Sequence, residues 1–289
     1  MPRKELTAKT GQFKKVQGLY RAANRRKYAQ AVVEGPQAVR ELLITKPQLL
    51  RDVYSTERAL AAHTDIATLI AENDFYLHLL PPDLFQQLSQ EAQGILAVAQ
   101  IPDEPEIGKL LADAQLLIFP LRAADPGNLG TIIRAADAFG AAGVITGTGS
   151  VEVTNPKVIR SSAGSVFHLP IIESELPEEF IAQAKSAGFQ VLAADGNADF
   201  YLDELLFTKD IGNDVGKFDL TRKTLWVVGN EAHGFSESER AIVDAAVAVR
   251  MQGRAESLNV AMATAICLYT SAQAQLLRQS THSSVPSTV

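Results

Sequence analysis

The stretch LWVVGNEAHGFS, residues 225–236, decides the fold because an apolar run ends there in a polar turn. Four consecutive apolar residues, 225–228, are typical of a strand buried on both faces of a parallel sheet. Gly229 breaks this strand, and the next residues include Glu231, which is either a carboxylate in water or a placed hydrogen-bonding group. Ser236 and Glu239 match the S-x-x-E capping box, so a helix is expected to begin there.

Outward from this stretch, strand and helix patterns alternate along residues 113–277. Apolar strands are predicted at 115–119, 143–146, 190–194, 224–228 and 246–249, and helices at 128–139, 155–162, 177–187, 237–245 and 257–277. Short apolar strands that alternate with helices indicate an α/β fold, a mostly parallel sheet with helices on both faces.

A smaller α/β domain is predicted over residues 14–101, after a basic N-terminal arm at 1–13. Its segment VVEGPQAVREL, residues 32–42, reads as a strand end, a turn at Gly35-Pro36 and a helix. The acidic and proline-containing stretch 102–112 is expected to be an exposed linker. The polar residues 278–289 are expected to be a disordered tail.

Two further polar turns accompany predicted helices. In DPGNLGTIIRAADAFG, residues 125–140, Asn128 can cap the helix and Arg134 lies off its buried stripe. In ESLNVAMATAICLYTSAQAQLL, residues 256–277, Ser257 is a plausible N-cap, and Leu258 and Asn259 occupy a first turn with free amides. Taken alone, each segment is also explained as an ordinary core helix. If the turns at 128–134, 229–231 and 257–259 converge, they form one pocket.

Charge and composition narrow the function classes. The net charge is −6, yet residues 1–27 contain nine basic side chains and one acidic one, so this segment either engages phosphates or is merely solvated. The start has no apolar signal region and no apolar run approaches a membrane span, so a cytoplasmic protein is expected. The single cysteine, Cys267, is expected to pack in a helix. The chain contains no G-x-G-x-x-G after a strand, no P-loop, no H-E-x-x-H and no paired C-x-x-C, which argues against dinucleotide, ATP and zinc chemistry.

Three motifs in this order resemble the TrmH (SpoU) family of the SPOUT methyltransferase class. They are N-x-G-x-x-x-R at 128–134, G-N-E-x-x-G-F at 229–235 and E-S-L-N-V at 256–260, and the loop RSSAGSVFHLP at 160–170 also fits. The likeness covers about residues 115–275, and the N-terminal domain resembles the substrate-binding domain that often precedes the catalytic one. The resemblance implies a trefoil knot, a homodimer, S-adenosyl-L-methionine as cofactor, and methylation of a ribose 2′-hydroxyl of RNA. Ribosomal RNA is favoured over transfer RNA, and neither a metal nor a membrane is expected.

The resemblance also assigns the site residue by residue. Gly229, Val249 and Leu258 would contact the cofactor, while the reaction centre would be lined by Asn128, Arg134, Glu231, Ser257 and Asn259. One departure is Arg250, where the family usually has proline, which frees the backbone in a cofactor loop. Arg250 is also the only sequence support for a rival function, an RNA-binding relative that no longer transfers methyl groups. A small-molecule α/β enzyme would require the three motifs to be coincidence.

Overall fold

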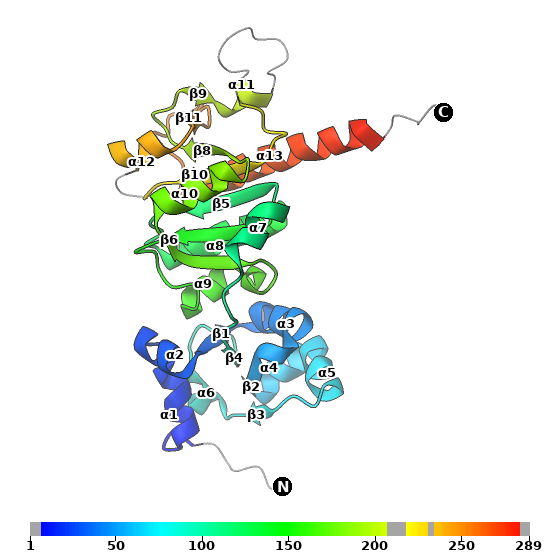
Figure 1. The fold of residues 1–289 in the computed structure, drawn as a ribbon. Helices are drawn as coiled ribbons and strands as arrows, with labels where there is room; N and C mark the ends of the chain where they lie inside the picture. The colour runs from blue at the N-terminus through cyan, green and yellow to red at the C-terminus, as the bar shows by residue number, and fades with distance from the viewer. Residues whose placement is uncertain (1–6, 207–217, 231–233, 284–289) are drawn as a thin grey trace. The chain divides into compact units, whose positions relative to one another are not determined.

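The computed structural model describes residues 7–206, 218–230 and 234–283 (Figure 1). The chain divides into two compact units, one of Met1–Asp103 together with Glu152–His168, the other of Glu104–Val151 together with Leu169–Val289. The segment 152–168 therefore belongs to the first unit, although its sequence lies inside the predicted α/β domain at 113–277.

The second unit is built on a parallel sheet. Its seven strands are β5 (Leu116–Pro120), β6 (Gly143–Gly147), β7 (Ile171–Glu175), β8 (Gln190–Ala194), β9 (Phe200–Tyr201), β10 (Thr224–Val228) and β11 (Ala245–Ala248). Their spatial order is β7-β6-β5-β10-β8-β11-β9, and every pairing is parallel. The predicted parallel α/β fold is confirmed, and the trefoil knot stays a prediction.

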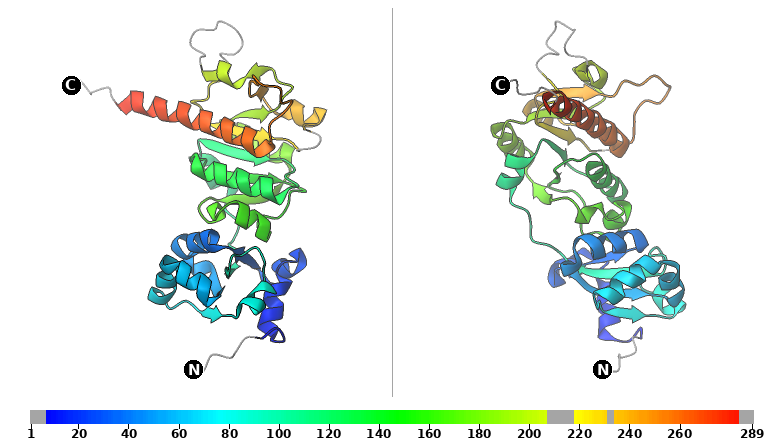
Figure 2. Two further views of the ribbon diagram at one scale, coloured as in Figure 1. Left: turned by 180° about the vertical axis from the view of Figure 1, so that it is seen from behind. Right: turned by 90° about the vertical axis from the view of Figure 1, so that its right-hand side faces the viewer.

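Helices cover both faces of this sheet. On one face, Leu225 and Val227 pack with apolar residues of α7 (Ile107–Asp113), α10 (Pro177–Ser186) and α12 (Glu237–Ile242). On the other face, Trp226 donates its indole N–H to Ser271 Oγ at 2.9 Å. Ser271 lies on α13 (Val260–Ser283), which runs beside α8 (Pro126–Ala138) in both views of Figure 2. The alternation of side chains along β10 thus builds the two layers.

The expectation that no apolar run approaches the length of a membrane span does not hold for helix α13. Its residues Val260–Arg278 are long and apolar enough to cross a membrane by length and composition, with 28% of that window buried. The buried face includes Thr264, Cys267 and Ser271, and it packs on the sheet. Burial raises the pKa of the Cys267 thiol to about 12, which agrees with the predicted packing role. A helix that covers a sheet meets the same criterion as a membrane span.

Two segment boundaries differ from the sequence predictions. The expected linker 102–112 includes most of α7, whose Leu110 and Leu111 are buried, because these two leucines complete one face of the sheet. Helix α13 continues to Ser283, into the stretch expected to be a disordered tail. In both cases the polar composition of the segment did not indicate the helix. Helix α7 packs on the sheet, and the end of α13 continues a helix that is packed earlier in its length.

The first unit has a four-stranded sheet in the order β1-β4-β2-β3. The strands are β1 (Gln30–Glu34), β2 (Leu50–Ser55), β3 (Leu77–Leu79) and β4 (Ile95–Gln100), and only β2 and β3 pair in parallel. One face packs on α3 (Pro36–Thr45), α4 (Glu57–Ala62) and α5 (Thr64–Glu72). The other face packs on α1 (Gly11–Gly18) and α6 (Pro82–Gln86).

Most of the basic segment 1–27 is part of this fold. Phe13, Val16 and Leu19 are buried in the core beneath α1, and α2 (Ala22–Tyr28) follows directly. Arg25 of α2 is only 3% exposed, and its Nη2 lies 2.5 Å from Glu152 Oε2. Arg25 therefore holds the segment 152–168 in place, since a buried guanidinium needs a paired acid.

The segment 152–168 contains α9 (Pro156–Ser161) and a 3-10 turn, η2 (Ser165–Phe167). Ile159 of α9 is buried in the same core as the residues of α3. A Cβ at Gly164, whose φ is +97°, would lie 2.6 Å from the Glu41 side chain. Glycine is required there both for the backbone conformation and for the close approach.

Candidate active site

Several predicted site residues follow the carboxyl ends of the central strands, at one edge of the second sheet. Helix α8 follows β5, Gly229 follows β10, and Val249 follows β11. β10 lies between β5 and β8, and β8 also pairs with β11, so these ends are neighbours. In parallel α/β sheets, ligands bind at this edge.

The turn after β10 closes on itself. Asn230 and Gly234 exchange backbone hydrogen bonds, with the Asn230 N–H donating at 3.2 Å and the Gly234 N–H at 2.8 Å. A Cβ on Gly229 would lie 2.7 Å from the Gly234 carbonyl oxygen. Glycine at 229 is therefore required by the turn itself, whether or not a ligand also approaches its backbone.

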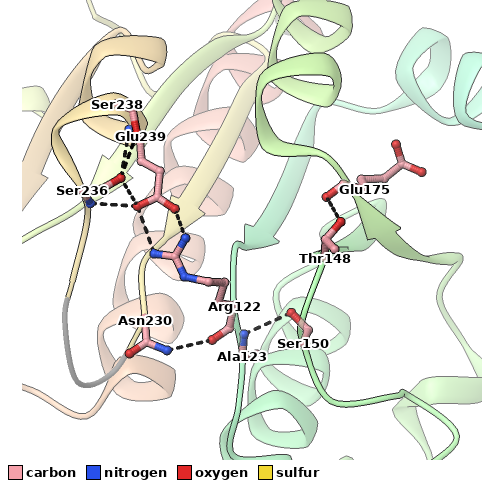
Figure 3. Close-up of polar contacts among 9 residues, drawn as sticks. All are labelled: Arg122, Ala123, Thr148, Ser150, Glu175, Asn230, Ser236, Ser238 and Glu239. Carbon is pink, nitrogen blue, oxygen red and sulfur yellow. Dashed lines mark hydrogen bonds and ion pairs between the residues drawn. The ribbon is translucent and has the colours of Figure 1, made fainter.

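An ion pair between the half-exposed Arg122 and the buried Glu239 holds this turn in position (Figure 3). Arg122, just after β5, pairs with both carboxylate oxygens of Glu239, which is 4% exposed. Asn230 Nδ2 donates to the Arg122 carbonyl oxygen at 3.3 Å. Burial alone would raise the pKa of Glu239, but hydrogen bonds from Arg122 and Ser236 outweigh burial and hold that pKa below its usual value.

Glu239 has a second role in the capping box of α12. Ser236 Oγ accepts from the Glu239 N–H, and the Glu239 carboxylate accepts from the Ser236 N–H at 2.8 Å. The capping box read from S-x-x-E is confirmed. Its ion pair with Arg122 was missed, since no local spacing links positions 117 residues apart.

Further along the same edge, the loop after β6 meets the end of β7 (Figure 3). Thr148 Oγ1 donates to the Glu175 carbonyl oxygen at 3.3 Å, and Ser150 Oγ accepts from the Ala123 N–H at 3.1 Å. Burial, with the negative charges of Glu104 and Glu179, raises the pKa of the Glu175 carboxyl. The hydrogen bond to Ser150 ties the β5 loop to its neighbour.

The first and third sequence motifs meet directly. Asn259 Nδ2 donates to Asn128 Oδ1 at 3.0 Å, although the two residues are 131 positions apart. This contact joins the start of α8 to the start of α13. The predicted convergence of these two turns is observed at these two residues.

Both helix starts differ in detail from the predictions. Asp125, not Asn128, caps α8, because its Oδ1 accepts from the Asn128 N–H at 2.8 Å and Pro126 starts the helix. Asn259, not Ser257, caps α13, since its Oδ1 accepts from the Ala261 and Met262 N–H groups at 2.9 and 3.3 Å. Asn259 thus uses its oxygen for the helix and its amide for Asn128.

For the remaining predicted site residues, the structure gives the exposure of each side chain. Arg134 is exposed on α8, Ser257 is exposed before α13, and Leu258 and Val249 are half-buried. Glu231 lies outside the described residues. The structure therefore brings Asn128 to Asn259 and sets the Gly229 turn beside the β5 loop, with Arg134 facing solvent.

Arg250, which stands where the family usually has proline, is held by side chains of neighbouring elements. Its guanidinium lies 3.8 Å from the ring centroid of Tyr201, and it bonds Asp203 Oδ2 at 3.0 Å and Glu204 Oε1 at 2.9 Å. These partners belong to β9 and α11 (Leu202–Leu206). A stacked and doubly paired arginine thus ties down the loop after β11, where proline would have stiffened the backbone.

Comparison with known proteins agrees with this geometry. Residues 115–269 match the model of the SpoU rRNA Methylase family, and residues 32–105 match the domain described as RNA 2'-O ribose methyltransferase substrate binding.

Two curated relatives carry rRNA methyltransferase names. The 23S rRNA (uridine(2479)-2'-O)-methyltransferase of Streptomyces viridochromogenes is 34% identical over 66% of this chain and 64% of its own length. The 23S rRNA (guanosine(2553)-2'-O)-methyltransferase RlmP of Bacillus subtilis is 29% identical over 91% of this chain and 96% of its own length.

A solved structure extends the likeness across both units. The SpoU methyltransferase AviRb from S. viridochromogenes, in complex with the cofactor AdoMet, has a TM-score of 0.74 and 26% identity, covering 93% of this chain and 99% of that one. The family model spans more than half of the sequence, including all three motifs. The chain belongs to the SpoU rRNA Methylase family.

Proposed function

We propose that this protein transfers a methyl group from S-adenosyl-L-methionine to a ribose 2′-hydroxyl of ribosomal RNA in the cytoplasm. The observation that carries the proposal is the Asn259–Asn128 hydrogen bond, which assembles two family motifs at the carboxyl edge of the sheet. The remaining motif, residues 229–235, turns at Gly229 beside the loop after β5. The curated relatives named as 23S rRNA 2'-O-methyltransferases support ribosomal RNA over transfer RNA.

The residues present fit the cofactor. Gly229 and Val249 directly follow two strands that both pair with β8, so they supply backbone donors and acceptors at neighbouring strand ends. Val249 and Leu258 are half-buried and apolar, as the wall of an adenosine site should be. When bound, S-adenosyl-L-methionine supplies an activated sulfonium methyl group, so the protein has only to orient the hydroxyl and manage its proton.

Arg134 is assigned to the RNA side of the reaction. A guanidinium stays protonated, so it cannot act as an ordinary base. Exposed on α8, it is able to hold a phosphate and to stabilise negative charge that develops on the ribose oxygen. Asn128, Ser257 and Asn259 position the reacting groups, and the proton acceptor is either Glu231 or an RNA phosphate oxygen.

Replacing Arg134 tests this assignment. Arg134→Ala is expected to lower the methylation rate by about 100-fold, the usual cost of losing one charge-stabilising donor, with thermal unfolding unchanged. Thr131→Ala, another exposed position of α8, is the control and should methylate at the parent rate. A parental rate in the folded Arg134→Ala variant would remove Arg134 from the mechanism.

The basic segment is proposed to add phosphate affinity. Deleting residues 1–27 would remove Phe13, Val16 and Leu19 from the core, so charge substitutions are the sounder test. Lys14, Arg21 and Lys27 are exposed, whereas Arg25 is occupied by Glu152. Changing the three exposed residues to alanine should weaken RNA binding and flatten its dependence on salt, because fewer counterions are released. An unchanged salt slope would contradict this role.

A homodimer is proposed from the outer face of α13. Met262, Tyr269 and Leu276 recur every seven residues and are 57%, 52% and 55% exposed. Such a stripe on a helix that already covers a sheet is typical of an interface between copies. The knot and the arrangement of the active site near this interface are part of the same proposal.

The rival function is an RNA-binding protein that has lost methyl transfer. Titration calorimetry with S-adenosyl-L-methionine separates the two, because binding of the cofactor is expected only for the enzyme. The paired and stacked Arg250 weakens the rival, since this residue is accommodated by a built cluster.

A further inference from the structure

The first unit contains a cavity of about 380 Å³ that the reaction above does not use. It lies within this unit, between the α1–α2 turn, the end of β1, residues 86–91 and the start of α9. The residues that matter are Tyr20, Glu34, Gln86, Gln90, Asn155 and Arg160. Its volume is in the range of sites that bind small ligands.

The floor of the cavity is a fixed polar network. Glu34 is 3% exposed, and its Oε1 accepts from Tyr20 Oη at 2.6 Å and from Ser89 Oγ at 2.5 Å. Its Oε2 accepts from Arg160 Nη1 at 2.6 Å. A buried carboxylate is tolerated only when it is paired in this way. Burial and the Glu34 carboxylate raise the pKa of Tyr20 above its ordinary range, so its hydroxyl stays protonated and donates.

The rim, in contrast, carries unused hydrogen-bonding groups. Gln86 and Gln90 are exposed, and neither side-chain amide makes a hydrogen bond within the described part of the chain. Asn155 uses its Oδ1 to accept from the Lys157 N–H. Gln86 and Gln90 each offer an amide donor and an acceptor together, which is the pattern that the edge of a nucleobase presents.

The surroundings favour a nucleic acid over a free metabolite. Tyr20 is 37% exposed and lies between α1 and α2; the exposed Lys14 and Lys27 lie on these helices, and the exposed Arg21 precedes α2. Basic side chains beside a polar cavity can hold the phosphates that flank a base within it. A stacked base inside a duplex cannot enter a cavity, whereas an unpaired base can.

We propose that this cavity binds one unpaired nucleotide of the substrate RNA, with its base edge on the Gln86 and Gln90 amides. The inference rests on the proposed function, because it takes RNA to be the substrate. Tyr20 supplies an aromatic wall, and Arg160, anchored to Glu34, presents its cation to the flanking phosphate. The site would select RNA that has an unpaired loop.

The test compares two RNA probes with the full-length protein. One probe is a synthetic RNA hairpin with an unpaired loop, and the other is a blunt duplex of the same stem sequence. The double variant Gln86→Ala/Gln90→Ala should bind the hairpin about tenfold more weakly by fluorescence anisotropy, since two modest hydrogen bonds are lost. Its affinity for the duplex and its salt slope should stay at parent values, because no charge is removed.

The control is Gln48→Ala, an exposed glutamine of the same unit outside the cavity, which should leave hairpin binding unchanged. Hairpins that contain 4-thiouridine in the loop should photocrosslink to peptides that carry Tyr20 or Gln90. Unchanged hairpin affinity in the double variant, an equal loss on the duplex, or crosslinks elsewhere only, would overturn the proposal.

The two proposals fail in different ways. If the proposed function is wrong, the parent protein binds RNA without methylating it. If only the nucleotide site is wrong, the parent methylates RNA and the double variant keeps the same KM and kcat. A correct nucleotide site raises KM in the double variant and leaves kcat near the parent value.

Discussion

Asn259 shows how one side chain serves both stability and the site. Its oxygen caps α13 by accepting from the Ala261 and Met262 N–H groups, and its amide nitrogen holds Asn128. The sequence motifs include both asparagines, but the sequence predicted Ser257 as the N-cap of α13. Ser257 is exposed, and the helix is capped by Asn259 instead.

The two roles of Asn259 can be separated by substitution. Asn259→Ser keeps a capping oxygen but is too short to reach Asn128, so it should retain stability and lose methylation activity. Asn259→Ala loses both and should cost about 1 kcal/mol of unfolding free energy. Thermal denaturation and single-turnover methylation measure the two effects. Equal activity in the serine variant and the parent would show that the Asn128 contact is dispensable.

Arg250 departs from the family pattern, and its contacts with Tyr201, Asp203 and Glu204 show how the chain accommodates it. Arg250→Ala should release the loop after β11 and weaken S-adenosyl-L-methionine binding by about threefold, a modest change because exposed ion pairs contribute little. Arg250→Pro should preserve affinity, since proline stiffens the same backbone. Calorimetry provides the readout, with Arg254→Ala as the control in the same loop. Parental affinity in Arg250→Ala would show that the cluster does not support the cofactor loop.

At the scale of elements, helix α12 is held in place by Arg122, a residue far from it in the sequence. The capping box fixes where the helix begins, while Arg122 fixes it against the β5 loop and, through Asn230, against the turn after β10. The Gly229 turn therefore depends on Glu239 for its position.

This dependence predicts how stability varies with pH. The pKa of Glu239 is lowered in the folded protein, so its contribution is complete above the unfolded value of 4.5 and is lost as the pH falls through the lower folded value. Glu239→Gln should lower the melting temperature at neutral pH and flatten its decline below about pH 4.5. Glu237→Gln, exposed in the same first turn, is the matched control. Parallel melting curves for Glu239→Gln and the parent across this range would contradict the assignment.

At the scale of the whole molecule, α13 has one face on the sheet and another that carries partly exposed apolar side chains. Hydropathy alone cannot distinguish these faces from a membrane span, because it averages around the helix. The seven-residue recurrence of Met262, Tyr269 and Leu276 favours a second copy of the chain as the partner.

Charged substitutions on the outer face test the dimer. Met262→Glu/Leu276→Glu should shift the protein from dimer to monomer in light scattering and lower methylation, while circular dichroism stays the same. Leu176→Glu, an exposed leucine elsewhere in the second unit, is the control. A monomeric parent, or a double variant that remains dimeric, would rule out this interface.

The sequence by itself determined the α/β class, the positions of most strands and helices, and the three motifs. These are local signals: the apolar run 225–228, the S-x-x-E cap and the glycine at 229 each act within a few residues. Only the tertiary structure decided that Asn259 meets Asn128, that Arg122 pairs with Glu239, and that residues 152–168 complete the first unit. Such contacts join residues more than one hundred positions apart, and their energy depends on burial and packing that no local pattern encodes.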